Sequence, residues 1–259
     1  MNNASLQSEL ADKVAVITGG ADGIGLGIAH RCRAAGAQVL IADVNAETVA
    51  TLSNQSGYHG LVCDVSKDED VARMRTAAQA LGEVSLVVAN AGIAVGGRFE
   101  QIPMTEWQRL FEVNVFGVVR TIQAFLPDLM SRGSGRVVVT GSSAGLFTSG
   151  GMDAPYTASK YALRGMAHAL ANYGKSGGVS VHYLAPRLTD TVFPKSAVAW
   201  GRRGSRVTSD RALGDDFDSV DAVVDALFNG MQDNRFLISL TPDTRERLMG
   251  YADDPLKVF

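Results

Sequence analysis

The sequence predicts an α/β fold: a doubly wound parallel sheet of the Rossmann type, with about seven strands, helices on both faces and a single domain. From Val14 onward, short β-branched runs alternate with longer amphipathic stretches. Several of the short runs are apolar almost throughout, as strands covered by helices on both faces must be. A glycine-rich turn follows the first of these strands, as in nucleotide-binding α/β domains.

Each element can be placed in chain order. Between the strands, periodic apolar patterns predict helices, and this alternation favours right-handed βαβ units. After the last strand we expect a polar helix and an acidic, proline-containing tail. The single domain should span residues 13–259, with a flexible segment at 1–12 before it and a long substrate flap at about 187–217. The expected strands are 14–18, 38–43, 58–63, 85–89, 135–141, 179–184 and 235–239, and the main helices 23–36, 45–53, 68–82, 104–133 and 155–174.

Composition excludes several classes of protein. The net charge of −3 gives no electrostatic reason to expect nucleic acid or an anionic membrane as a partner. No apolar run approaches the length of a membrane span, and the first residues lack the pattern of a secretion signal. Cys32 and Cys63 fall in a helix and at a strand end, so two reduced, buried thiols are expected. We therefore expect a cytoplasmic protein with a small-molecule substrate and no metal site.

The turn after the first strand has the pattern Gly19-x-x-x-Gly23-x-Gly25 and opens a helix. The strict G-x-G-x-x-G pattern fails, because counting from Gly23 its third glycine position holds Ile28. Glycines at these positions let the backbone approach a pyrophosphate at the helix N-terminus. A glycine-rich turn needed only for packing is the alternative, but the place of this turn in a βαβ unit favours nucleotide binding.

The end of the second strand bears on the choice of cofactor. Asp43 lies there, and its carboxylate can accept hydrogen bonds from adenosine ribose hydroxyls and repel a 2′-phosphate. Asp22 adds negative charge nearby, and no Arg or Lys is placed to bind a phosphate. Asp43 can also cap the next helix, a role compatible with the first. The sign of the local charge favours NAD over NADP.

Tyr156 and Lys160 are four residues apart at the start of a predicted helix, and therefore on one face of it. A surface lysine beside a half-buried tyrosine is the ordinary explanation of such a pair. If the two groups lie about 5 Å apart at an effective dielectric constant of about 20, the ammonium favours a tyrosinate by roughly 3 kcal/mol. This would move the tyrosine pKa towards neutrality, where a phenol exchanges protons with an alcohol or carbonyl.

Further motifs accompany this pair in a fixed order. They are "TGGADGIG" (18–25), "CDV" (63–65), "ANAG" (89–92), "EVNVFG" with Asn114, "TGSSAG" (140–145) and "YTASK" with Tyr156 and Lys160. In these motifs and their order, the chain from about Lys13 to Ile238 resembles the short-chain dehydrogenase/reductase (SDR) family, in its compact single-domain branch.

The resemblance implies a catalytic set of Asn114, Ser143, Tyr156 and Lys160. Ser143 lies thirteen residues before Tyr156, the spacing implied for the family serine, and this selects Ser143 rather than Ser142. Its hydroxyl would hold the substrate oxygen, and Lys160 would also bind the nicotinamide ribose. Asn114 would anchor a water that links Lys160 to solvent.

The resemblance also implies the cofactor contacts. Residues after the third strand would bind adenine, those after the fourth would form the cofactor floor, and those after the sixth would bind the nicotinamide carboxamide. The full set is Gly19, Asp22, Gly23, Ile24, Gly25, Asp43, Asp64, Val65, Asn90, Ala91, Gly92, Tyr156, Lys160, Pro186, Thr189 and Thr191.

One segment departs from the family pattern. Where P-G-x-V-x-T is usual, the chain reads "APRLTDT" (185–191), with Arg187 at the glycine position. The Arg187 side chain could point to solvent, reach the cofactor pyrophosphate, or enter the substrate mouth. Downstream, the basic cluster of Arg202, Arg203 and Arg206 is interpreted as a solvated face rather than an anion site.

The expected activity is that of an NAD-dependent short-chain alcohol dehydrogenase/ketone reductase, which interconverts a secondary alcohol and a ketone through a Ser-Tyr-Lys-Asn proton relay. The alternative is a catalytically idle NAD-binding regulatory or scaffold protein on the same fold. An epimerase would need a larger substrate domain than the remaining chain provides. The two longest helices are apolar enough to suggest a homodimer or homotetramer. Apolar pocket candidates, typical of small-molecule sites, join Ser143: Ile93, Ala94, Val95, Phe147, Met152, Ala154 and Phe193.

Overall fold

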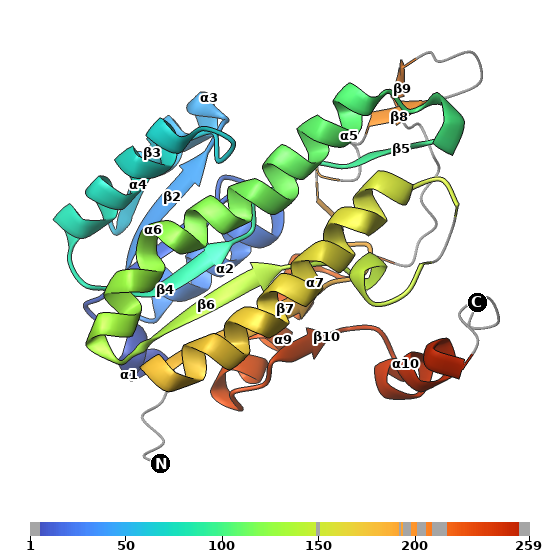
Figure 1. The fold of residues 1–259 in the computed structure, drawn as a ribbon. Helices are drawn as coiled ribbons and strands as arrows, with labels where there is room; N and C mark the ends of the chain where they lie inside the picture. Colours follow the sequence, from blue (N-terminus) through green and yellow to red (C-terminus); the bar gives the residue numbers. More distant parts are fainter. Residues whose placement is uncertain are drawn as a thin grey trace.

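The structure, a computed structural model, describes residues 6–148, 151–191, 193, 198–200, 206–208 and 217–253. Its main sheet has seven strands, all parallel, in the order β10-β7-β6-β4-β1-β2-β3 (Figure 1). The predicted doubly wound parallel sheet is confirmed, and the first two strands match their expected ranges residue for residue. The strands are β1 (Val14–Thr18), β2 (Gln38–Asp43), β3 (Tyr58–Val62), β4 (Val84–Ala89), β6 (Gly135–Thr140), β7 (Val179–Ala185) and β10 (Leu237–Ser239).

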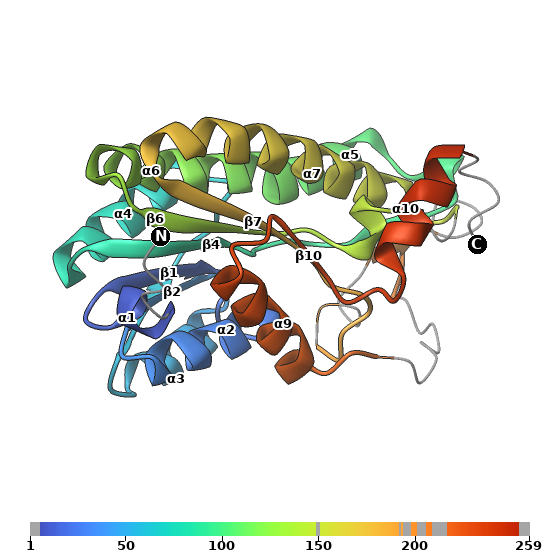
Figure 2. The same ribbon diagram turned by 90° about the horizontal axis from the view of Figure 1, so that it is seen from below.

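Helices cover both faces of this sheet (Figure 2). One face carries α4 (Asp68–Leu81), α6 (Gly117–Arg132) and α7 (Ala154–Gly174), and the other carries α1 (Leu6–Leu10), α2 (Gly23–Ala34), α3 (Ala46–Ser53) and α9 (Val220–Gln232). Strand β1 shows how the two cores form: Val14 and Val16 join one buried cluster, whereas Ala15 and Ile17 join the other. This explains why the first four residues of the strand, 14–17, are all apolar.

A second, three-stranded sheet was not predicted. It consists of β5 (Val95–Gly97), β8 (Val198–Trp200) and β9 (Arg206–Thr208), in the order β5-β8-β9, and lies beyond the carboxyl ends of the main strands (Figure 1). Three-residue strands are too short to produce a periodic pattern. Helix α5 (Met104–Phe111) lies beside this sheet, and the expected polar C-terminal helix is α10 (Thr244–Asp253).

The expectation of a flexible segment over residues 1–12 is wrong for residues 6–12. Leu6 and Leu10 of α1 are buried, and the carboxylate of Glu9 accepts hydrogen bonds from Arg136 at 2.7 and 2.9 Å. Leucines four residues apart give even this short helix an apolar side that packs on the sheet layer. Residues 1–5 lie outside the described residues, as does most of the predicted flap at 187–217.

Cys32 and Cys63 are both free and buried, as expected. Burial raises the pKa of the Cys32 thiol to about 12 and that of Cys63 to about 11, so both are protonated at neutral pH. Within the described part of the chain, no helix has the length and apolar character needed to cross a bilayer.

A buried polar cluster links α1 to the strands. His182 on β7 is 1% exposed; its Nδ1 donates to the carbonyl oxygen of Arg235 at 2.7 Å, and its Nε2 accepts from Arg136 at 3.3 Å. These two bonds require the neutral imidazole with its proton on Nδ1. Burial lowers the pKa of His182 to about 4.

This cluster predicts a loss of stability in mild acid. An unfolded histidine has a pKa near 6.5, so between about pH 6.5 and 4 the unfolded chain binds a proton that folded His182 refuses. The free energy of unfolding should therefore fall as the pH drops through this window, by roughly 3 kcal/mol at most. Denaturant unfolding at pH 7 and pH 5 measures it. His182→Gln should weaken the pH dependence, whereas His59→Gln, at a partly exposed position, should preserve it; equal slopes in all three proteins would contradict the assignment.

Candidate active site

The loops after β1 and β4 meet at the carboxyl edge of the sheet, where the strand order reverses direction. Gly19 has a φ of +61°, and a Cβ there would lie 2.8 Å from the Cα of Ala91. The Asn90 amide donates to the carbonyl oxygens of Thr18 and Gly19 at 3.1 and 3.0 Å. The Thr18 hydroxyl accepts from the backbone N–H groups of Asn90 and Ala91. The predicted floor residues therefore hold the glycine loop in place.

The glycine loop passes directly into helix α2. Asp22 caps the helix by accepting from the Gly23 N–H at 2.7 Å. A Cβ at Gly25 would lie 2.1 Å from the carbonyl oxygen of Gly19, so only glycine fits this turn. First-turn amides have no acceptor within their own helix, and here they open at the switch point of the sheet. This donor set fits the pyrophosphate of a dinucleotide.

Carboxylates lie at the ends of the next two strands. Asp43 accepts from the backbone N–H of Ala21 at 3.1 Å and from that of Asn45 at 3.0 Å, which fixes it beside the glycine loop. Asp64 accepts from both the N–H and the hydroxyl of Ser66. Val65, 5% exposed, packs on helix α6 at Gly117, where an added Cβ would lie 2.6 Å from a Val65 methyl.

Tyr156 and Lys160 lie together on α7, as their spacing predicts. Lys160 is 4% exposed; its ammonium donates to the carbonyl oxygen of Thr140 at 3.0 Å and lies 5.4 Å from the centre of the Tyr156 ring. Phe193 contacts the same ring, with centroids 6.0 Å apart. A buried cation thus lies beside a phenol at the end of strand β6.

The protonation states differ from the sequence expectation. Burial raises the pKa of Tyr156 to about 12; a hydrogen bond with Ser142 acts in the opposite direction, and the charge of Asp153 adds to the increase. The direction is opposite to the expected shift towards neutrality, because loss of solvation dominates the pKa of the buried phenol. Burial lowers the pKa of Lys160 to about 8. At neutral pH Tyr156 keeps its proton and most Lys160 is charged.

The serine beside Tyr156 is Ser142, not Ser143. The Ser142 side chain hydrogen-bonds to Tyr156, and its Oγ also accepts from the Ala144 N–H at 3.1 Å. Ser143 lies in the short helical turn that follows, where its N–H donates to the Pro186 carbonyl at 2.8 Å. The sequence prediction selected Ser143 by counting back from Tyr156. That count runs through the loop between the serine motif and the tyrosine motif, and neither motif determines the length of this loop.

Asn114 lies in a π-helical turn (Glu112–Phe116) between α5 and α6, so the helix expected over 104–133 is interrupted there. Such turns often mark functional positions. The Asn114 side chain is fully buried: it accepts from the Ile93 N–H at 2.8 Å and donates to the Ile93 carbonyl at 3.0 Å and to Ser159 Oγ at 3.2 Å. Ser159, adjacent to Lys160 on α7, was not identified from sequence.

The predicted pocket residues divide into two groups. Val95 and Ile93 pack in one apolar cluster with Tyr156 and Trp200, so β5 and β8 supply a wall beside the tyrosine. Trp200 lies in the predicted flap and was not among the pocket candidates. Phe147 is 4% exposed and covered by Tyr251 and Arg247 of α10. Phe147 therefore packs in the core on the side of α10, and its place in the pocket stays a prediction. Met152 is exposed, and Ala154 begins α7.

The Arg187 guanidinium pairs with Asp218, a partner that was not considered from sequence. Thr189 is 5% exposed, and Thr191 lies against Gly23 of the glycine loop. The segment that departs from the family pattern thus still brings Thr191 to the glycine loop. Arg202 and Arg203 lie outside the described residues, and only the backbone of Arg206 is described.

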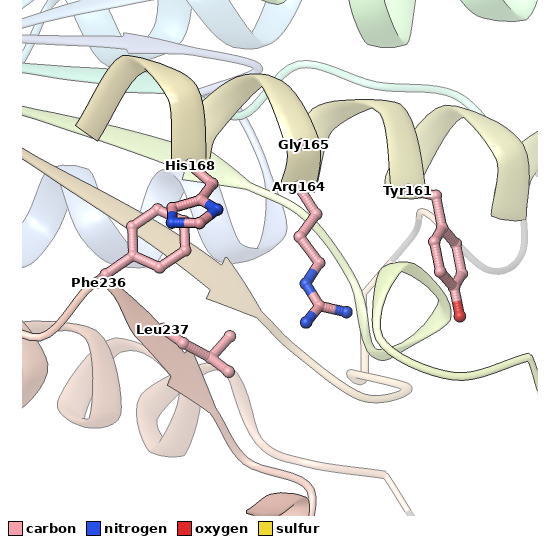
Figure 3. Close-up of a pocket in the computed structure, with 6 residues that line it drawn as sticks. All are labelled: Tyr161, Arg164, Gly165, His168, Phe236 and Leu237. Atoms are coloured by element: carbon pink, nitrogen blue, oxygen red, sulfur yellow. The ribbon is translucent and has the colours of Figure 1, made fainter. Parts of the chain in front are cut away.

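A separate groove of about 440 Å³ runs between α7 and the edge strand β10 (Figure 3). No predicted site residue lines it. Figure 3 shows Arg164 and His168 projecting from α7 on the side of Phe236 and Leu237. The remaining lining residues are Tyr161, whose hydroxyl donates to the Leu146 carbonyl, and Gly165. The groove and the Tyr156 site are therefore distinct.

Comparison with known proteins places this geometry in a family. A family model described as short chain dehydrogenase matches residues 13–201, which include the glycine loop, Asn114 and the Tyr156–Lys160 pair. The chain belongs to the short-chain dehydrogenase/reductase family. The predicted family is thus confirmed, and the predicted enzyme class is confirmed at the level of an oxidoreductase.

Relatives of this SDR include dehydrogenases of hydroxyl-bearing compounds. It is 31% identical over 253 residues to 1-deoxy-11-beta-hydroxypentalenate dehydrogenase of Streptomyces exfoliatus, covering 95% of this chain and 89% of that protein. It is 34% identical to 3beta-hydroxysteroid dehydrogenase 2 of Eggerthella lenta, covering 74% and 76%. A crystal structure of an SDR from Burkholderia phymatum in complex with NAD aligns with a TM-score of 0.82, at 27% identity and 95% coverage of both chains.

Proposed function

We propose that this SDR is an NAD-dependent oxidoreductase that interconverts a secondary alcohol and a ketone. The observation that carries the proposal is the buried Tyr156–Lys160 pair, with Ser142 bonded to the tyrosine, next to a glycine loop that fits a dinucleotide. The NAD complex of the Burkholderia phymatum SDR and the two hydroxyl dehydrogenases named above support the same assignment.

The cofactor residues would act as a frame. NAD(H), when bound, takes or supplies the hydride. The backbone of the Gly19–Gly25 loop and the first turn of α2 would hold the pyrophosphate, and Asp43 would accept from the adenosine ribose hydroxyls. Asp64, Val65 and the floor residues at 90–92 would hold the adenine side, and Pro186, Thr189 and Thr191 the nicotinamide side. Lys160 would hold the nicotinamide ribose, orienting the reacting carbon.

The remaining residues would move the proton. Because Tyr156 keeps its proton at neutral pH, it can donate that proton to the oxygen of a ketone; in the reverse direction its oxygen takes the proton of the alcohol. The Ser142 hydroxyl would hold the substrate oxygen as charge develops on it. The Lys160 ammonium would stabilise the tyrosinate, and Asn114 would hold the water that returns a proton from solvent.

The substrate should be apolar and neutral around the reacting carbon. Val95, Trp200 and Phe193 gather around Tyr156, and the nearby carboxylate of Asp153 disfavours an anion. A homodimer or homotetramer fits the exposed apolar side chains on α5, the π-helical turn and α7: Met104, Phe116 and Tyr173 are 68%, 50% and 62% exposed.

The proposed preference for NAD(H) over NADP(H) can be tested at Asp43. The parent enzyme should have a higher kcat/KM with NAD(H) than with NADP(H), measured at the nicotinamide absorbance with a panel of secondary alcohols and ketones. Asp43→Ala should narrow the preference, mainly by weakening NAD(H), because it removes the ribose acceptor and the charge that repels a 2′-phosphate. Glu47→Ala, an exposed carboxylate on α3, should change neither cofactor.

Two results would contradict the proposal in different ways. A higher kcat/KM with NADP(H) in the parent would overturn the cofactor assignment alone. Tight NADH binding with no turnover of any alcohol or ketone would instead favour the idle cofactor-binding protein.

A further inference from the structure

Arg187, the residue that departs from the family pattern, forms a bidentate ion pair with Asp218. Arg187 Nη2 donates to Asp218 Oδ1 at 3.1 Å, and Nε donates to Oδ2 at 3.3 Å. The two side chains are 27% and 15% exposed, so the pair is largely shielded from solvent. A guanidinium that grips both oxygens of one carboxylate fixes orientation as well as distance.

The same aspartate also holds the backbone that follows Arg187. The Asp218 N–H donates to the carbonyl of Leu188 at 2.9 Å, and its carbonyl accepts from the N–H of Asp190 at 3.1 Å. Thr189 pairs with Asp218 in an isolated parallel bridge, and its hydroxyl donates to the Arg187 carbonyl at 3.1 Å. Side chain and backbone of one residue thus determine the course of residues 187–190.

This segment lies between the serine turn and the glycine loop. Just before it, Pro186 accepts from the N–H of Ser143, and just after it, Thr191 lies so close that a Cβ on Gly23 would be 2.8 Å from its methyl group. Two residues beyond Asp218, Val220 packs on α2 at Gly27, where an added Cβ would lie 2.5 Å away. The ion pair is therefore anchored at both ends to the helix that opens at the cofactor crevice.

We propose that Arg187 and Asp218 form a positioning pair that sets Thr189 and Thr191 for the nicotinamide half of the cofactor. The inference rests on the proposed function, because it assigns the pair to NAD(H) binding. Neither side chain needs to touch the cofactor. The guanidinium, by pairing with Asp218, fixes the course of residues 187–190, which lack the glycine of the family pattern. The adenosine half, held by Asp43 and the glycine loop, should not depend on the pair.

The test compares NADH with ADP-ribose, which lacks the nicotinamide. In calorimetric titrations, Arg187→Ala and Asp218→Asn should each raise the Kd for NADH roughly tenfold, and the double variant should lose no more than either single one, since all three break the same interaction. The Kd for ADP-ribose should change by less than about twofold. Arg187→Lys, which keeps the charge, should recover part of the NADH affinity. Lys13→Ala, which breaks an ion pair with Glu83 at the opposite end of β1, is the matched control.

Three outcomes in the variants would overturn the inference, and one in the parent would do so. Equal losses for NADH and ADP-ribose would indicate a general structural role or a direct pyrophosphate contact. Losses that multiply in the double variant would show that the two residues act separately, and unchanged NADH affinity would show that the pair positions nothing. If the parent binds neither ligand, the proposed function itself fails and the inference fails with it; weak binding in the variants alone leaves the function intact.

Discussion

Tyr156→Phe should lower kcat by about 10²- to 10⁴-fold, the range that a positioned acid or base contributes. The variant keeps the aromatic ring that contacts Phe193 and lies beside the Lys160 ammonium, so packing around the site should survive. Only the hydroxyl is removed, and with it the proton that burial retains on Tyr156 at neutral pH. The Kd for NADH should stay close to that of the parent, because the glycine loop, Asp43 and Lys160 are untouched.

Helix α7 offers a matched control for this variant. Tyr161 is on the same helix, but its hydroxyl donates to the Leu146 carbonyl and its ring lines the groove beside β10 (Figure 3). Tyr161→Phe should therefore leave turnover with the best alcohol of the panel nearly unchanged. If Tyr156→Phe retained activity within a few-fold of the parent, or lost no more than Tyr161→Phe, proton transfer by Tyr156 would have to be abandoned.

The fold could be predicted from the sequence where burial leaves a continuous signal. Residues 14–17 of strand β1 are all apolar because each face of the strand contributes to a different core, and such runs can be recognised without any alignment. The small sheet of β5, β8 and β9 escaped prediction, since three-residue strands carry no period. The docking of α1 was missed because two buried leucines in five residues are too few to stand out in a polar N-terminus.

The candidate site shows the same division. Tyr156 and Lys160 were correctly placed together because helix geometry fixes neighbours at i and i+4. The pKa of Tyr156 was misjudged because burial cannot be evaluated from sequence. Arg187 and Asp218 are 31 residues apart, and their pairing depends on how the segment after β7 meets the segment before α9, which no local pattern encodes.

The sequence spacing and the structure assign different serines to the reaction at Tyr156: the spacing selects Ser143, and the structure favours Ser142. Ser142→Ala should lower kcat by about 10²- to 10³-fold, the usual cost of removing one hydrogen-bond donor to a developing oxyanion. Its hydroxyl bonds to Tyr156, whereas Ser143 holds the turn through its backbone N–H to Pro186, a bond that alanine preserves. Ser143→Ala should therefore stay within a few-fold of the parent, and neither variant should shift the Kd for NADH. Turnover of the same alcohol by the two single variants decides the assignment, provided that both variants keep the melting temperature of the parent. If Ser143→Ala is the inactive one, the serine turn rearranges when substrate binds, and the thirteen-residue spacing identifies the catalytic serine better than the hydrogen bond between Ser142 and Tyr156 does.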